Sequence, residues 1–184
     1  SVKVFDNSLS RLRRLQNDLG SRIYTSVLQP KVLAKSIMRA DVVIGAIRSP
    51  LGKTPCVVSE EMVENMKEGS VIVDVSIDQG GCFETSRVTN HNNPTFVKHG
   101  VVHYCVPNIA SRVPRTASFA LSNIFSPILM NMGDSGGCLD LIRNDHGFRS
   151  GVYIYKGILV SEVLGRVFDL KYKDIDLLMM GLKG

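Results

Sequence analysis

Asp78 is the residue of this sequence whose type and setting most directly allow chemistry. It follows an apolar stretch at 71–77 and comes directly before Gln79, Gly80 and Gly81. A carboxylate at the end of a buried strand, beside glycines that admit close approach, is well placed to exchange protons with a reacting centre. A carboxylate that only caps the following turn would give the same pattern. The pattern therefore marks Asp78 as a candidate acid–base group and leaves a purely structural role open.

A second acid, Asp6, ends the apolar stretch at 2–5. Dinucleotide-binding folds place an acid at such a strand end, where it accepts hydrogen bonds from the hydroxyls of the adenosine ribose. A carboxylate there repels the additional phosphate of NADP and therefore favours NAD. An acid that simply begins the turn before the next helix would occupy the same position.

The segment AIRSPLGKT, which begins at Ala46, follows another apolar run. Its small residues would let the backbone approach a cofactor closely, although a plain loop has a similar composition. A phosphate-binding loop of the G-x-x-x-x-G-K-[ST] type is excluded, because position 47 is Ile where that motif needs its first glycine.

Histidines and cysteines do not indicate a metal site. No two of the histidines have the spacing of metal ligands, and the cysteines form no C-x-x-C pair, so no disulfide framework is indicated either. The residues are His91, His99, His103 and His146, and Cys56, Cys82, Cys105 and Cys138.

The elements that must position these residues alternate along the first part of the chain. Apolar runs predict five strands, and amphipathic segments between them predict helical crossovers, which together indicate an α/β fold with a doubly wound parallel sheet of the Rossmann type. The strands are expected at 2–5, 21–27, 41–47, 70–77 and 100–106, and the helices at 9–19, 30–39 and 59–67. From about 113 onward the spacing of apolar residues is typical of helices, so a boundary is expected near 112–116.

Composition limits the class of protein. The chain has 184 residues, of which 44% are hydrophobic, and a formal net charge of +5. No apolar run approaches the roughly 20 residues that a bilayer span needs, and no signal peptide is recognised, so we expect a cytoplasmic protein. Basic residues are not interleaved with aromatic ones in any known nucleic-acid motif, so we expect no nucleic-acid partner.

The run from 71 to 116, VIVDVSIDQGGCFETSRVTNHNNPTFVKHGVVHYCVPNIASRVPRT, resembles the alanine dehydrogenases. ADVVIGA at 40–46, VFDNSLSRLRRL at 4–15 and ALSNIFSPIL at 120–129 keep the order of that family, so the resemblance covers nearly the whole chain. The related pyridine nucleotide transhydrogenase subunit shares the fold but differs where this chain reads IDQGGCFETSR, and it is the weaker match.

The resemblance implies an NAD-dependent enzyme that interconverts L-alanine with pyruvate and ammonia. It implies that Asp78 is the catalytic carboxylate beside the nicotinamide, where burial would favour its neutral form and the positive ring its charged form. The cofactor-binding residues implied by the resemblance are Asp6 and Arg11 at the adenosine end, and Ala46, Ile77, Asp78 and Asn108 toward the nicotinamide. The family also implies a homo-oligomer, usually a hexamer.

The chain departs from that family at its N-terminus. The substrate domain of the family, with its catalytic histidine, and the first strand of the cofactor domain, with its G-x-G-x-x-G turn, have no counterpart here. That strand would lie between the strands expected at 2–5 and 41–47, so two inner edges of the sheet would be unpaired.

We therefore expect a piece of an alanine dehydrogenase that is inactive by itself. Residues 1–114 would be the distal part of its NAD-binding domain, and 115–184 a helical segment that packs on the substrate domain. Two other origins of the chain stay open, namely a degenerate gene product and a chain that pairs with the missing domain or another copy. A transhydrogenase-like NAD module and a non-catalytic fragment of the fold are the alternative functions.

Overall fold

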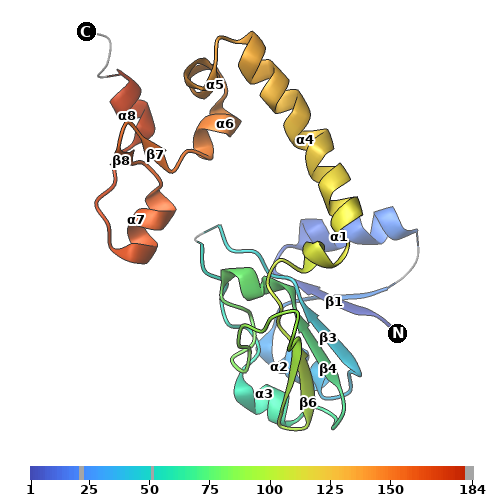
Figure 1. The fold of residues 1–184 in the computed structure, drawn as a ribbon. Coiled ribbons are helices and arrows are strands. Elements are labelled where there is room, and N and C mark those ends of the chain that lie inside the picture. The colour runs from blue at the N-terminus through green and yellow to red at the C-terminus, as the bar shows by residue number, and fades with distance from the viewer. Residues whose placement is uncertain (21–22, 51, 181–184) are drawn as a thin grey trace. The chain divides into compact units, whose positions relative to one another are not determined.

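The structure is a computed structural model, and it describes residues 1–20, 23–50 and 52–180 (Figure 1). The chain divides into two compact units. The first unit comprises Ser1–Ser49 with Lys53–Pro107, and the second comprises Pro50–Gly52 with Asn108–Gly184.

The first unit contains two sheets whose strands are mostly parallel. The smaller sheet pairs β1 (Lys3–Asp6) with β2 (Tyr24–Val27) in parallel. The larger sheet has the order β3-β4-β6-β5, in which only β5 runs antiparallel, and its strands are β3 (Val42–Gly45), β4 (Val71–Asp74), β5 (Thr95–Lys98) and β6 (Val101–Tyr104). Parallel strands joined by helices are the architecture that the sequence predicts.

The helices of the first unit begin and end at recognisable signals. In α1 (Leu9–Leu19) the hydroxyl of Ser8 accepts a hydrogen bond from Arg11 N, and Gly20 ends the helix in the left-handed region at φ 58°. The N-cap of α3 (Glu60–Glu64) is Ser59, which accepts from Met62 N. Proline opens α2 (Pro30–Ile37), where a missing N–H costs nothing.

The hydrophobic core lies between the larger sheet and the helices α2 and α3. Ile72 of β4 and Val63 of α3 are fully buried at its centre. Leu33 and Ile37 of α2 join the same cluster, and Phe5 of β1 packs against it. The core therefore connects the two sheets through side chains, although no hydrogen bond between described strands connects them.

The two sheets are separated where the sequence leads us to expect a gap. In the doubly wound order 3-2-1-4-5-6, β2 and β1 correspond to positions 3 and 2, while β3, β4 and β6 correspond to positions 4, 5 and 6. Among the described strands, β1 and β3 each pair on one side only, and position 1 between them is not filled. The parallel α/β fold and its split inner edges are both as predicted.

Some elements differ from the sequence-based expectation. The strand expected at 70–77 ends at Asp74, because Val75–Gln79 turns into a short 3₁₀ helix, η1. The antiparallel strand β5 was not predicted, since Pro94 and Gly100 flank a short, mixed stretch. The strand expected at 21–27 begins at Tyr24, and positions 21 and 22 lie outside the described residues.

The second unit is mainly helical, as the apolar spacing indicates. It contains a 3₁₀ turn, five helices and a short antiparallel hairpin within its described residues, namely η2 (Ile109–Arg112), α4 (Pro114–Asp134), α5 (Cys138–Asn144), α6 (His146–Ser150), β7 (Ile154–Tyr155), β8 (Ile158–Leu159), α7 (Glu162–Phe168) and α8 (Ile175–Met180). Apolar spacing at 115–133, 138–144, 160–168 and 174–180 predicts α4, α5, α7 and α8, whereas α6 is not predicted.

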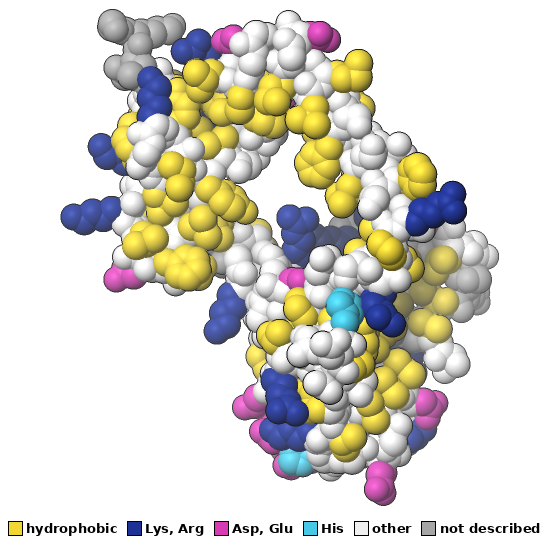
Figure 2. Space-filling model, in the orientation of Figure 1, with side chains coloured by type: hydrophobic (Ala, Val, Ile, Leu, Met, Phe, Trp, Pro, Cys, Tyr) yellow, Lys and Arg dark blue, Asp and Glu magenta, His cyan; other side chains and the backbone are white. Residues whose placement is uncertain are grey.

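The long helix α4 buries none of its residues, although many of them are apolar. Figure 2 shows hydrophobic side chains on its surface, and Phe119, Ile124 and Phe125 are all more than half exposed. In the parts of the chain that the structure describes, no helix combines the length and the hydropathy needed to cross a bilayer.

Candidate active site

Asp78 lies in η1, directly beyond the carboxyl end of β4. Gly80 ends this turn in the left-handed region at φ 98°, and Ile77 is buried beneath it. The side chain of Asp78 is exposed. The expectation that Asp78 is buried is therefore wrong for this chain, because the chain leaves the sheet at Asp74 and carries Asp78 above the strand ends.

Two loops join side by side at this edge of the sheet, and we call residues 46–49, 53–54 and 75–82, all of the first unit, the ledge. The hydroxyl of Ser76 accepts a hydrogen bond from Ile47 N at 2.8 Å. Gln79 holds the other end, because its side-chain Oε1 accepts from Ser49 N at 3.1 Å and its backbone oxygen accepts from Thr54 N at 2.9 Å. The loops after β3 and β4 thus form one surface, with Ala46 and Asp78 exposed on it.

The level of the ledge is set by the register of the strands. Gly45 at the end of β3 pairs with Asp74 at the end of β4, so both loops leave the sheet at the same height. A Cβ at position 45 would collide with the sulfur of Cys82 and with the ring of Phe83. Only glycine lets the returning chain pack this closely over the end of β3.

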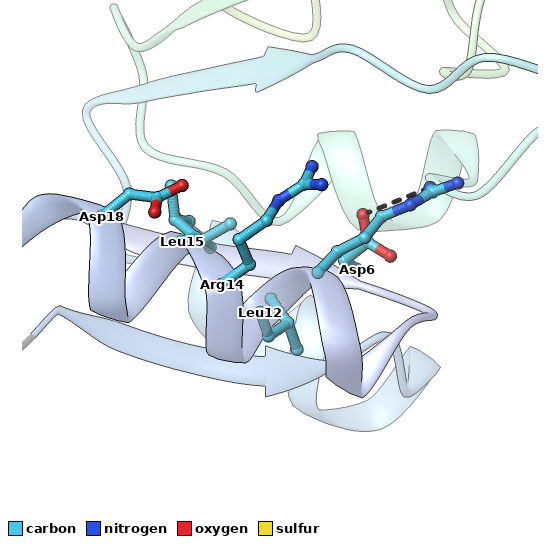
Figure 3. Close-up of a pocket in the computed structure, with 7 residues that line it drawn as sticks. Asp6, Leu12, Arg14, Leu15 and Asp18 are labelled. Carbon is cyan, nitrogen blue, oxygen red and sulfur yellow. Dashed lines mark ion pairs between the residues drawn. The ribbon is translucent and has the colours of Figure 1, made fainter.

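Asp6 ends β1, the strand at one edge of the smaller sheet. Its Oδ1 accepts a hydrogen bond from Ser8 N at 2.7 Å, and its Oδ2 lies 3.8 Å from the guanidinium of Arg11. A shallow pocket of about 240 Å³ opens beside them, and Figure 3 shows Asp6, Leu12, Arg14, Leu15 and Asp18 around it. The carboxylate oxygen Oδ2 retains acceptor capacity toward this open side.

Asn108 precedes η2 and adopts the left-handed region at φ 53°. Asparagine tolerates this conformation better than most residues, so its presence at the start of the turn has a local explanation. Asn108 is exposed and belongs to the second unit.

His103 is a core residue of β6 and is fully buried. Its Nδ1 lies 3.0 Å from Val101 O and its Nε2 lies 2.8 Å from the hydroxyl of Thr85, so the neutral ring donates to the carbonyl and accepts from threonine. Burial holds the pKa of His103 below its ordinary value. The bonding pattern is that of a structural histidine.

His99 lies in a surface cluster with two glutamates of α3. Its Nε2 is 2.7 Å from Glu60 Oε1 and 3.5 Å from Glu64 Oε1, close enough for the three side chains to hold a cation. The ammonium of Lys98, at 2.6 Å, already pairs with Glu60, and its hydrogen bond holds the pKa of Glu60 below its ordinary value. Side chains of the chain itself thus balance the charge of this cluster.

Sequence reasoning missed three residues that shape the ledge: Asp74, Ser76 and Gln79. Each acts through hydrogen bonds to backbone or side-chain atoms that only the folded loops bring near. The available signal was Asp74, the first acid in VDVSID, since an acid inside an apolar strand needs buried partners.

The family described as "Alanine dehydrogenase/PNT, C-terminal domain" matches residues 1–162 of the chain. The alanine dehydrogenase of Mycolicibacterium smegmatis is 40% identical over 176 residues, which cover 94% of this chain and 46% of that protein. Alanine dehydrogenase 2 of Staphylococcus aureus is 36% identical over 176 residues, with 95% and 47% covered. The chain thus spans about half the length of the curated relatives it matches.

Solved structures give the same picture. An L-alanine dehydrogenase superposes with a TM-score of 0.82 at 37% identity, covering 92% of this chain and 46% of that one. A transhydrogenase from Sinorhizobium meliloti superposes with a TM-score of 0.66 at 22% identity, covering 88% and 42%. At that identity the second likeness concerns the fold alone.

Proposed function

Because this chain belongs to the family of alanine dehydrogenase/PNT C-terminal domains, we propose that it is the NAD-binding portion of an L-alanine dehydrogenase. The proposed reaction converts L-alanine, NAD and water reversibly into pyruvate, ammonia and NADH, with NAD as the hydride acceptor. The observation that carries the proposal is the ledge, which exposes Asp78 beyond the carboxyl ends of β3 and β4. Ligands of doubly wound sheets bind at this edge.

The described residues fit part of the cofactor. At the end of β1, the carboxylate of Asp6 faces an open pocket and can accept hydrogen bonds from ribose hydroxyls, and Arg11 lies beside it. The sequence contains no G-x-G-x-x-G turn, which in this fold holds the pyrophosphate. We propose that a segment outside these residues, from the domain that the family carries before this portion, supplies that turn.

The nicotinamide end of the cofactor would lie along the ledge. Ala46 offers a small exposed surface there, and Ile77 supports the turn from beneath. Asp78 would face the reacting carbon. The family resemblance assigns Asn108, a residue of the second unit, as a polar contact for the nicotinamide ring. These assignments rest on the resemblance and, for Ala46, Ile77 and Asp78, on their positions in the loops directly beyond β3 and β4.

Asp78 is proposed to manage the protons of the reaction. Oxidation of an amine to an imine and its hydrolysis both require proton transfers, and an accessible carboxylate beside the reacting carbon can accept and return them. Its exposure in this chain leaves room for the substrate and for the domain that would cover it. The shell that excludes water would then come from outside these residues.

The remaining parts of the proposal concern the whole protein. We propose that it acts in the cytoplasm as a homo-oligomer, a hexamer by analogy with the family. The apolar surface of α4 supports a role for residues 115–184 in packing on the substrate domain.

The decisive experiment is a chimera, in which residues 1–184 replace the matching portion of the M. smegmatis alanine dehydrogenase. We expect the purified chimera to oxidise NADH when pyruvate and ammonium are both present, and to need both. The Asp78→Asn variant of the same chimera should lose at least about 100-fold in kcat, because it removes the proposed acid–base group.

Two results would contradict the proposal. One is a folded chimera that binds NADH but does not turn over pyruvate and ammonium. The other is an Asp78→Asn chimera with nearly unchanged kcat, which would remove Asp78 from the chemistry. An Asp41→Asn chimera serves as the control, because Asp41 pairs with Lys67 on the surface away from the ledge.

A further inference from the structure

Asp74, the last residue of β4, carries a carboxylate that is almost completely buried, at 1% exposure. Among the residues that the structure describes, no ion pair involves it. A buried carboxylate is costly unless hydrogen bonds replace the water it has lost. The hydrogen-bond donors to Asp74 therefore indicate which part of the chain this carboxylate holds in place.

All of these donors belong to the chain that follows β4. Oδ1 accepts from Ser76 N at 3.0 Å, and Oδ2 accepts from Cys82 N at 3.0 Å and from the hydroxyl of Ser86 at 2.7 Å. The thiol of Cys82 lies 3.7 Å from Oδ1. Burial, together with the nearby charge of Asp74, raises the pKa of Cys82 to about 12, so this thiol stays protonated and can donate.

The contacts of Asp74 bracket the turn that carries Asp78. Ser76 stands at the start of the turn and Cys82 just after its end, so one carboxylate fixes both ends of the intervening chain. Gly81 has a φ of 82°, and a Cβ there would lie 2.6 Å from Asp74 Oδ2. A side chain at position 81 would collide with this oxygen, so glycine is needed there for the loop to close tightly around Asp74.

From this geometry we infer that Asp74 is a positioning residue, which fixes the turn and thereby keeps Asp78 in the position on the ledge that its proposed proton transfers require. This inference rests on the proposed function of Asp78. Asp74 itself touches neither cofactor nor substrate, since its oxygens are enclosed by the loop, and it acts only through the turn. Small displacements of a reacting group reduce rates strongly, so the loss of Asp74 should lower kcat.

The test uses the active chimera and the variant Asp74→Asn, which keeps the size of the side chain but replaces one acceptor oxygen by a donor. We expect kcat to fall by roughly 30- to 100-fold, with the KM for NADH changed less than about threefold. A double-mutant cycle then separates positioning from general destabilisation. In the Asp78→Asn background, Asp74→Asn should lower kcat by less than about threefold, because the group it positions is already gone.

Two further variants keep the test decisive. Ser86→Ala removes one hydrogen bond from Asp74 and should lower kcat about 5-fold, with the same loss of effect in the Asp78→Asn background, even where Asp74→Asn does not fold. Val63→Ala loosens the core without touching the ledge. It should lower the melting temperature yet leave kcat within about twofold at a temperature where the protein is folded.

Amide hydrogen exchange on the 184-residue chain gives a readout that does not depend on activity. The Cys82 and Ser76 amides should lose protection in Asp74→Asn, whereas strand amides of β6 should keep it. Full multiplicative losses in the double mutant, or an Asp74→Asn chimera with normal kcat, would overturn the inference. A wild-type chimera without turnover would contradict the proposed function instead, and unchanged exchange at Cys82 would then also overturn the positioning role.

Discussion

Among single residues, two carboxylates four positions apart have opposite surroundings: Asp74 ends β4, and Asp78 lies in the 3₁₀ turn that follows. Asp74 is enclosed by donors of its own loop, and Asp78 is exposed above the strand ends. The buried acid is suited to fixing structure and the accessible one to exchanging protons. The proposed function of the ledge therefore depends on both carboxylates.

The buried His103 should make the stability of the folded chain depend on pH. Its pKa is lowered in the folded chain mainly by burial, with smaller contributions from Lys98 and His99. The unfolded chain therefore binds a proton at a higher pH than the folded chain does, and the stability from neutral His103 is lost as the pH falls below about 6.5. We expect the free energy of unfolding, measured in urea, to decrease between neutral pH and pH about 5.

The control is His103→Gln, which can still hydrogen-bond to Thr85 but does not titrate. This variant should be less stable at neutral pH, yet its stability should change less with pH over the same interval. An equally steep pH dependence in His103→Gln would assign the effect to other groups.

The types and order of the residues predict the place of several of these side chains in the fold. The glycine pair after an apolar run identifies the turn at Asp78, and the acid after 2–5 identifies the end of β1. The burial of Asp78 was wrongly expected, since an apolar run does not reveal where the chain leaves the sheet. The role of Asp74 could not be read, because its donors at Cys82 and Ser86 become neighbours only in the folded loop.

At the scale of elements, the ledge is a joint between two loops that follow neighbouring parallel strands. Gln79 is central to it, because one residue binds Ser49 through its side chain and Thr54 through its backbone. The loop at 46–54 has no regular secondary structure of its own in its described residues. Its order therefore depends on this joint.

Replacing Gln79 by Ala removes the side-chain oxygen that accepts from Ser49 N. The free energy that holds the loop at 46–54 closed should then fall by about 1 kcal/mol. Trypsin can report this change, since Arg48 and Lys53 are exposed in the same loop. We expect cleavage after these two residues to be about 5-fold faster in Gln79→Ala, as the population of open loop rises.

Gln29→Ala is the matched control for this digestion. Gln29 precedes α2 and makes no capping hydrogen bond through its side chain, so the variant should be cleaved at the wild-type rate. Equal cleavage rates in Gln79→Ala and wild type would contradict the proposed joint.

Elements with clear end signals were predicted well. α1 spans the expected residues because Ser8 and Gly20 mark its two ends. The hydrogen-bonded turn after Asp74 and the edge strand β5 were not foreseen, since a short segment takes its conformation from the chain packed against it.

At the scale of the whole molecule, the sheet of the first unit is divided between β1 and β3. We expect the 184-residue chain by itself to show no turnover of pyruvate, ammonium and NADH. We also expect its Kd for NAD to be at least about 100-fold weaker than that of the chimera, because the cradle for the pyrophosphate is not part of it. Isothermal titration calorimetry of both proteins measures this difference.

Intact mass of the natural protein complements this measurement. A mass near the 20.2 kDa of this chain, together with turnover by the isolated chain, would contradict the expectation of a dependent portion. A clearly larger mass would identify the polypeptide in which activity should be measured.

The division of the sheet also bears on how the first unit forms. Each sheet is built from one contiguous stretch, β1 to β2 within Lys3–Val27 and β3 to β6 within Val42–Tyr104. Chain closure within each stretch spans fewer residues than a continuous sheet would require, so either sheet can nucleate without the other. Refolding should then proceed in two kinetic phases, and the slower one should report the docking of Phe5 against the shared core.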